Sequence, residues 1–244
     1  SDLILDFCYT EGYKKTSTKK KAGNKSHFFS KFVKNFRGKN NSDNNLEVSF
    51  QELSNDKYLK LYKIESNLVD YNSNTLETSV NFTREDENLF LGLDASIYET
   101  LKDDYDDKYE YILPEITIDK NLMSNNFLGD LDLQTKYKAH KYDTNKLTSF
   151  LINDFDWNYR EISHSTGLKS KFLANIKNIN YETKNVDEFK KDTTNELFGG
   201  LGYLTQLHLK KENNFGSHLL KPKFLLRYAP GSMRKETDGN RLTP

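Results

Sequence analysis

Hydrophobic and polar side chains alternate with a period of two along most of this 244-residue chain. Between residues 130 and 140, Asp, Gln, Lys and His occupy the even positions, while Leu, Thr, Tyr and Ala occupy the odd ones. Successive side chains of a β-strand point to opposite faces, so this pattern predicts a ribbon with one polar and one apolar face. A helix would scatter the same residues around its circumference.

The same alternation recurs from one end of the chain to the other. It is clear in residues 2–9, 46–51, 76–83, 89–98, 147–160, 168–176, 197–210 and 220–228, and weaker in 28–36 and 110–118. In the last of these, Ile112, Pro114, Ile116 and Ile118 form the apolar set. Polar stretches such as 178–194 and 211–217 predict turns and loops. Asp56–Tyr62 is the best helical candidate, although it fits the end of a strand equally well.

These patterns predict an all-β fold, an antiparallel up-and-down meander of about ten or eleven long strands. The spacing between strands, near 22–25 residues, exceeds the roughly 8–12 residues of a soluble sandwich. It suits long strands that short turns and long loops join alternately. No composition shift marks a domain boundary, so we expect residues 1–244 to be a single segment.

Composition helps to decide which environment the apolar and polar faces of the strands meet. Only 35% of the residues are hydrophobic, yet 16 Phe and 15 Tyr are too many for simple disorder. About eight strands already enclose all the space that side chains can fill, so a wider soluble barrel would hold water against apolar walls. A large transmembrane β-barrel resolves this because its apolar residues face lipid and its polar residues line a wet interior. A soluble β-sandwich or solenoid with one polar face stays open as the alternative.

In the barrel interpretation, the charged residues of the polar parity form a mixed-charge wall that faces the lumen. The wall consists of Asp130, Asp132, Gln134, Lys136, Lys138, Asp154, Asp156, Arg160, Lys221, Lys223 and Arg227. Such a wall can hydrogen-bond a polar plug or a phosphorylated sugar. Aromatic residues near strand ends fit the interfacial girdles of a membrane barrel, namely Tyr9, Phe82, Trp157, Tyr159 and Tyr228.

Other chemistry is sparse. Lys plus Arg and Asp plus Glu both number 36, so no global field favours nucleic acid. Cys8 is the only cysteine, and the histidines are too dispersed for metal-ligand spacing, so we expect no metal site and no cofactor. The acidic run 103–107, the basic run Lys14–Lys21 and the glycines of 199–202 fit loops and a strand bend better than ligand sites. No nucleophile motif is present, so we expect no enzyme.

Four segments in order resemble the barrel domain of the LPS-assembly protein LptD, also called organic solvent tolerance protein. They read SNDKYLKLY from Ser54, YEYILPEITIDKNL from Tyr109, TTNELFGGLGYLTQL from Thr193, and LLKPKFLLRYAPGSMRKETDGNRL from Leu219. The residues that carry the resemblance are Ser54, Asp56, Tyr58, Leu113, Pro114, Pro222, Tyr228 and Pro230.

The resemblance implies an outer-membrane barrel of a Gram-negative bacterium that assembles lipopolysaccharide into the outer leaflet. It implies an LptE-like plug lipoprotein, periplasmic bridge proteins and outer-membrane lipid as partners. The chain would be an internal fragment that lacks the N-terminal periplasmic domain and the closing strands, and we find no signal peptide in it. Another outer-membrane barrel, such as a porin or receptor, and a soluble β-rich binding module remain the alternatives.

Overall fold

The computed structural model describes residues 1–10, 23–102, 107–143, 145–187, 189, 193–213 and 216–230. The elements in chain order are β1 (Asp2–Thr10), β2 (Lys25–Arg37), η1 (Lys39–Asn41), β3 (Asp43–Leu53), α1 (Tyr58–Tyr62), β4 (Thr75–Asp86), β5 (Leu89–Thr100), β6 (Tyr109–Asn125), β7 (Gly129–Tyr142), β8 (Lys146–Asn158), β9 (Ile162–Ser163), β10 (Leu168–Lys184), β11 (Thr194–Leu207), β12 (Leu209–Asn213), β13 (Gly216–Leu220) and β14 (Lys223–Tyr228). No helix in these ranges is long and apolar enough to span a membrane.

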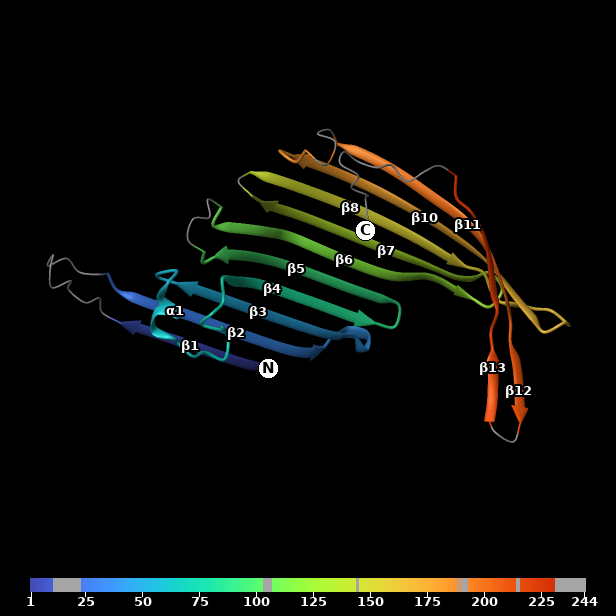
Figure 1. The fold of residues 1–244 in the computed structure, drawn as a ribbon, viewed down its shortest axis with the longest axis horizontal. Coiled ribbons are helices and arrows are strands. Elements are labelled where there is room, and N and C mark those ends of the chain that lie inside the picture. Colours follow the sequence, from blue (N-terminus) through green and yellow to red (C-terminus); the bar gives the residue numbers. More distant parts are fainter. Residues whose placement is uncertain are drawn as a thin grey trace. The chain divides into compact units, whose positions relative to one another are not determined.

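Twelve strands pair into one antiparallel sheet whose neighbours follow the order of the chain (Figure 1). The path runs β1-β2-β3-β4-β5-β6-β7-β8-β10-β11-β14, and β9 pairs with β10 beside it. This confirms the predicted all-β antiparallel meander. The strands β1 and β14 end the path, so the sheet is open over the part of the chain that is described.

The chain divides into two compact units. The N-terminal unit comprises Ser1–Thr117, Tyr137–Ser149 and Thr183–Val186, and the C-terminal unit comprises the remaining ranges, Ile118–Lys136, Phe150–Glu182 and Asp187–Pro244. Four long strands, β6, β7, β8 and β10, contribute residues to both units. Each unit has its own small cluster of buried hydrophobic residues.

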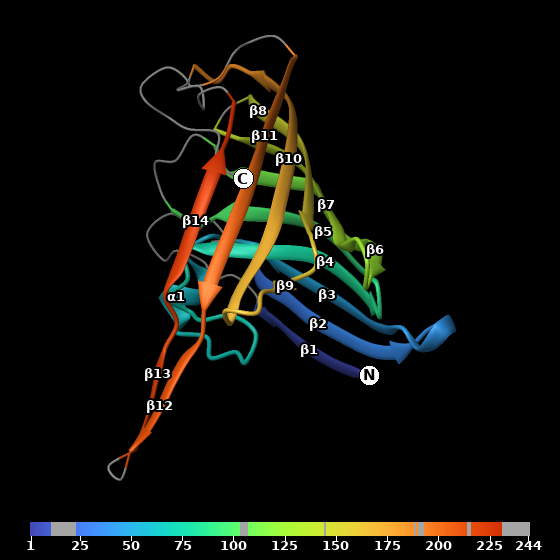
Figure 2. The ribbon, with the colours of Figure 1, turned by 90° about the vertical axis from the view of Figure 1, so that its right-hand side faces the viewer.

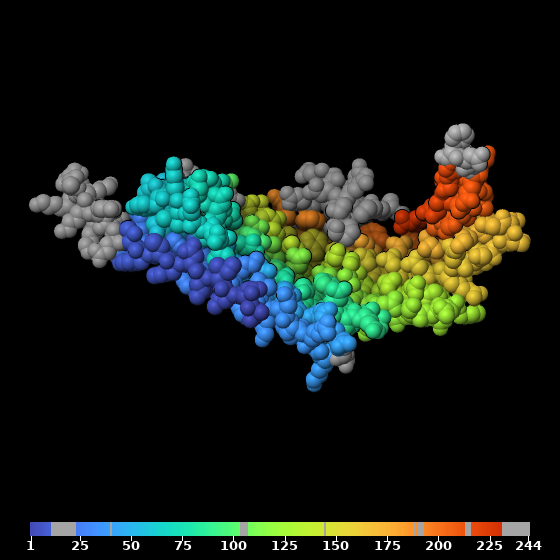
Figure 3. Space-filling view, turned by 90° about the horizontal axis from the view of Figure 1, so that it is seen from below, coloured from blue at the N-terminus to red at the C-terminus, as the bar shows by residue number. Residues whose placement is uncertain are grey.

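The core of the N-terminal unit lies between the sheet and the connection from β3 to β4. Tyr58 and Leu59 of α1 are buried with Phe29 of β2 and Leu76 of β4. Residues 54–74, which contain α1, stand to one side of β1 and β2 (Figures 2 and 3). The helical interpretation of Asp56–Tyr62 is confirmed, and Lys63 ends the helix with a left-handed backbone conformation (φ 48°).

In the C-terminal unit, a strand extends into the first part of a segment that was predicted to be a loop. The polar stretch 178–194 predicted a loop, yet β10 continues to Lys184. The alternation continues there, but the face that was apolar becomes polar and the polar face becomes apolar. Asn178 and Asn180 take the positions that apolar residues hold earlier in the strand, and Ile179 and Tyr181 are buried on the other face. Phe150, Phe189 and Phe198 pack against Ile179 and Tyr181.

A bulge in β6 explains why its sequence alternates weakly. Glu110 bonds to His140 at 2.6 Å and Glu115 bonds to Lys138 at 2.9 Å, so both carboxylates reach the same face of β7. Residues five positions apart in a regular strand point to opposite faces, so we infer that one extra residue lies between them. Pro114, which has no N–H to donate, sits in that interval. The single apolar set predicted for 110–118 is therefore wrong at Ile112, because Tyr111 and Leu113 share the opposite face.

The predicted loop 211–217 is also wrong over its described residues, because 211–213 belong to β12 and 216–217 belong to β13, and these two strands form a hairpin. β12 and β13 pair in the register that continues from β11 and β14, since Leu207 donates to the Pro222 carbonyl at 3.1 Å and Leu209 faces Leu220. Pro222 has no N–H, and the ladder breaks beside it. The hairpin projects beyond β11, as the orange ribbon in Figure 1 shows.

We expect Gly129→Ala to destabilise the C-terminal unit by about 3 kcal/mol or more in denaturant unfolding. Gly129 has φ +84°, and a Cβ there would lie 2.0 Å from the Asn158 carbonyl oxygen, so both strain and a backbone clash oppose it. Gly167→Ala is the matched control: φ is +81°, the nearest atom is 3.8 Å away, and strain alone costs about 1–2 kcal/mol. Equal losses for both variants would contradict the clash.

Candidate functional site

The candidate site is the two-faced surface of the sheet rather than a pocket with reactive groups. The pairing of β1 with β2 places Leu3, Leu5 and Phe7 of β1 on one face with Phe32 and Phe28 of β2. The opposite face of the same strands carries Asp6, Cys8, His27 and Lys31. We call these the apolar face and the polar face of the N-terminal unit.

Apolar side chains stay open to the surroundings across the apolar face of each unit. In the N-terminal unit they include Leu3, Leu5, Phe7, Tyr9, Phe28, Phe50, Val80 and Leu93. In the C-terminal unit, registers among β10, β11 and β14 align Phe172, Ile176, Leu197, Leu201, Phe224, Leu226 and Tyr228 on one face, and all are exposed. Contiguous apolar surface of this extent marks a surface that contacts another apolar phase or partner.

Polar side chains on the opposite face of the N-terminal unit bond to one another, both across neighbouring strands and along one strand. Lys31 pairs with Glu47 at 2.7 Å, Ser96 donates to Asp94 at 2.7 Å, and Asn81 donates to the same carboxylate at 3.5 Å. None of these residues was among the predicted wall residues. Polar residues such as Glu47 and Ser49 alternate with apolar residues in the sequence, as those of 130–140 do. The same pattern could therefore have identified them.

The predicted wall residues of β7 and β8 join similar cross-strand pairs. Asp154 pairs with Lys177 at 3.2 Å, Asn121 donates to Asp132 at 2.7 Å, and Ser124 donates to Asp130 at 2.7 Å. Lys138 pairs with Glu115 in the N-terminal unit, as described above. Asp154 and Lys138 are therefore paired with opposite charges, while Asp130 and Asp132 are hydrogen-bonded by uncharged groups and keep their charge.

Asp156 and Arg227, two more wall residues, line a hollow of about 290 Å³ in the C-terminal unit. Gly200 makes room for it: a Cβ at that position would lie 2.8 Å from the Asn175 amide oxygen and 3.3 Å from Arg227 Nε. The glycines of 199–202 thus serve close approach of neighbouring side chains, as predicted for small residues in a strand.

The remaining wall residues are scattered. Gln134 and Lys136 lie in β7, Lys223 faces Gln206 across β14 and β11, and Arg160 stands 5.4 Å from the ring centre of Phe127. Lys221 lies in the break between β13 and β14, outside any strand.

The residues that carry the family resemblance fall into two groups. Ser54, Asp56 and Tyr58 anchor the segment 54–74: Ser54 Oγ accepts the Ser26 N–H at 2.7 Å, and Tyr58 is 1% exposed. Burial raises the pKa of Tyr58 to about 12. Leu113 and Pro114 lie at the bulge of β6 and Pro222 at the break before β14, and Tyr228 and Pro230 end the described chain.

Lys108 ties the segment 54–74 to the sheet. Its ammonium lies 2.6 Å from Glu99 of β5 and 3.1 Å from Asp56. The hydrogen bond to Glu99, with that to Asp56, holds the pKa of Lys108 above its ordinary value. The sequence offered no signal for this contact, because 52 residues separate Lys108 from Asp56.

An aromatic row crosses three strands of the C-terminal unit. Ring centres of Trp157, Tyr159, Phe172 and Tyr203 follow one another at 5.6, 6.3 and 5.0 Å. Trp157 also donates its indole N–H to the Leu128 carbonyl at 2.9 Å. Trp157 and Tyr159 were predicted girdle residues, and the row adds two residues that the sequence did not single out.

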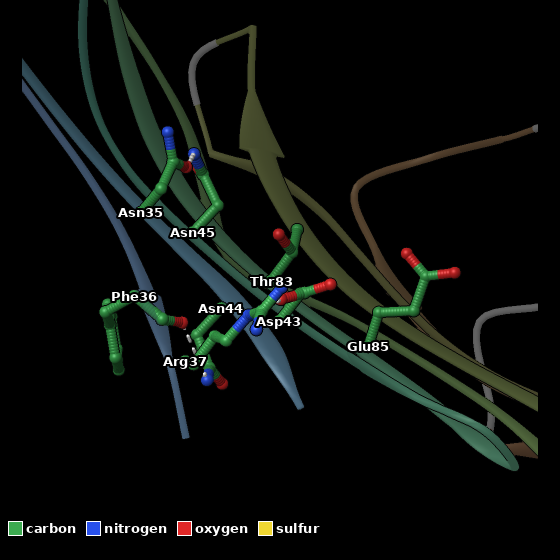
Figure 4. Close-up of a pocket in the computed structure, with 8 residues that line it drawn as sticks. All are labelled: Asn35, Phe36, Arg37, Asp43, Asn44, Asn45, Thr83 and Glu85. Carbon is green, nitrogen blue, oxygen red and sulfur yellow. Dashed lines mark hydrogen bonds and ion pairs between the residues drawn. The ribbon is translucent and has the colours of Figure 1, made fainter. Parts of the chain in front are cut away.

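A hollow of about 510 Å³ lies at the β2–β3 hairpin, and several of its polar groups bond to one another (Figure 4). Asn45 donates to Asn35 at 2.6 Å, and Asn44 donates to the Phe36 carbonyl at 3.2 Å. Glu85 points away from these groups (Figure 4). The hollow closes a turn rather than offering free groups to a ligand.

Histidines take structural positions where they are best defined. His27 is buried, lies 3.1 Å from Asp6 and stacks on Phe29, while His164 lies 2.7 Å from Ser170. Over the described ranges, no three His, Cys, Asp or Glu side chains are arranged to hold a metal ion. The basic run Lys14–Lys21 and most of the acidic run 103–107 lie outside the described residues.

No protein-family model matches the chain, and no curated protein matches it.

We expect Lys108→Ala to loosen the segment 54–74. The amides of Leu61 and Ile64, which bond to Lys57 and Leu59, should exchange hydrogen up to about fivefold faster, because a partly exposed ion pair contributes up to roughly 1 kcal/mol. Lys102→Ala is the control, because Lys102 is exposed and lies between β5 and β6 as Lys108 does. It should leave the hydrogen-exchange rates unchanged. Unchanged rates in both variants would show that the apolar cluster alone holds the segment.

Proposed function

We propose that this chain forms part of the wall of a large transmembrane β-barrel in the outer membrane of a Gram-negative bacterium. Its apolar faces contact hydrocarbon, and its polar faces line a hydrated interior. The observation that carries the proposal is the exposed apolar face, backed on the same strands by a face of mutually bonded polar groups. In lipid, every backbone N–H and C=O group must find its hydrogen-bond partner within the protein, and a closed sheet provides these partners.

The length of the apolar band supports this orientation. On β11 the apolar face runs from Leu197 to Leu207, eleven residues, and a transmembrane strand needs about 9–11. At the end of that band, where Asn178 pairs with Leu197, Asn180 donates to Asn178 at 2.6 Å on the apolar face, while Ile179 and Tyr181 are buried on the other face. Such an exchange suits strands that leave hydrocarbon for water, where the outside becomes polar and the inside forms an ordinary core.

The resemblance to LptD supplies the specific role, the assembly of lipopolysaccharide into the outer leaflet. The mixed donors and acceptors of the polar face suit a polar plug such as an LptE-like lipoprotein, or the sugars and phosphates of the cargo. The apolar face suits acyl chains. No covalent chemistry is assigned to the chain in this role, and periplasmic bridge proteins would deliver the lipid.

Neighbouring leucines of β14 provide a matched test of the membrane orientation. Leu226 is 63% exposed on the apolar face, and Leu225 is 51% exposed on the polar face. In vesicles, Leu226→Arg should lower the free energy of unfolding by about 2–4 kcal/mol near the midplane, and Leu225→Arg by less than about 1 kcal/mol. A water-exposed sheet predicts near-zero changes for both, and that result would reject the proposal.

The lipopolysaccharide role needs its own experiment. Depletion of the full-length protein in its host should lower the lipopolysaccharide that surface labelling detects, while total lipopolysaccharide is maintained. A porin or receptor would leave the surface labelling unchanged, and recovery of the protein in the soluble fraction without detergent would favour a soluble binding module.

A further inference from the structure

A groove of about 320 Å³ opens on the sheet of the N-terminal unit. Tyr111 and Leu113 of β6, Ala139 and Lys141 of β7, and Leu147 of β8 line it. Glu110 and His140, like Glu115 and Lys138, bond on the other face, so the groove lies on the apolar side of these strands. Its volume is within the range of about 300–1,000 Å³ that ligand sites occupy.

The β6 bulge and a small side chain create this groove. Without the extra residue near Pro114, the alternation of β6 would place Glu115 on the same side as Leu113 and bring its carboxylate to the groove. The small side chain of Ala139 leaves space between Leu113, which is exposed, and Leu147. The lining is therefore apolar along its length.

Lys141 gives the groove one charged end. Its ammonium stands 5.9 Å from the ring centre of Tyr111, and its side chain is exposed. The neighbouring Lys138 and Lys146 are neutralised by Glu115 at 2.9 Å and Asp143 at 2.7 Å. For Lys141 no carboxylate lies within 4 Å in the described part of the chain. Its charge is available to an anion.

The position of Lys141 along β7 matches the boundary between hydrocarbon and headgroups. Lys141 follows the odd-numbered residues from Leu131 to Ala139, which form the apolar side of β7. The strand ends at Tyr142, and the chain turns at Asp143. A lysine at such a boundary extends its ammonium toward the headgroups while its methylenes cover apolar surface.

We propose that this groove binds one anionic lipid, with an acyl chain along Leu113, Ala139 and Leu147 and a phosphate oxygen that accepts from Lys141 Nζ. The apolar length and the single cation at one end together fit an amphiphile with a negatively charged head. The inference rests on the proposed membrane function, because it requires the apolar face to meet lipid.

The test uses the full-length protein in phosphatidylcholine vesicles that contain spin-labelled lipid. Electron paramagnetic resonance measures the ratio of association constants for phosphatidylglycerol and phosphatidylcholine at the protein surface. Lys141→Gln should lower this ratio about fivefold, as expected for the loss of one lysine near the headgroups. Ala139→Phe, which fills the groove, should abolish the strongly immobilised phosphatidylglycerol component.

Lys34→Gln is the matched control. Lys34 is also exposed on the apolar face and stands 5.6 Å from the ring centre of Phe36, yet it lies outside the groove. This variant should leave the ratio within about twofold of the unmodified protein. Free inorganic phosphate added at millimolar concentration should not displace the labelled lipid.

The outcomes separate this inference from the proposed function. Insertion into vesicles with no effect of Lys141→Gln would overturn the lipid site and leave the membrane role standing. Failure of the unmodified protein to associate with vesicles would overturn both. Displacement by inorganic phosphate would show a phosphate site instead, and a dimer that Ala139→Phe abolishes would show a second copy in the groove; either result rejects the lipid.

Discussion

The structure depends on how the two faces of one sheet satisfy their side chains. Polar groups on one face bond to each other across neighbouring strands, as Lys31 does with Glu47 and Asp154 with Lys177. Many apolar groups on the other face stay exposed, and the described residues form no second layer over them. A conventional sheet covers its apolar face with a second layer, and in the proposed function hydrocarbon supplies that burial instead.

Local exceptions to this scheme mark where the environment changes. At the end of β10 the apolar face becomes polar through Asn178 and Asn180, and Tyr181 forms a small core on the opposite face. At β1 and β2 the segment 54–74 buries Phe29 in the same way. The exchange on β10 is explained if that strand extends past an apolar band into water, whereas at Phe29 the neighbouring Phe28 keeps the other face apolar.

The bulge of β6 links the fold to its proposed lipid contact. One inserted residue near Pro114 changes which side chains of β6 meet each face. Glu115 consequently reaches Lys138 on the polar face, while Tyr111 and Leu113 join Ala139 on the apolar face. The same event removes a carboxylate from the groove and leaves Lys141 without a neutralising neighbour among the described residues.

The sequence alone determined most of the strands and their antiparallel order, because a period of two is local and needs no knowledge of distant residues. It made Asp56–Tyr62 the best helical candidate but left the end of a strand equally possible there. Only the tertiary structure decided the register of β6, the extension of β10 and the pairing of Lys108 with Asp56. These depend on contacts between residues far apart in the chain, and a one-residue bulge leaves no mark in the sequence that differs from weak alternation.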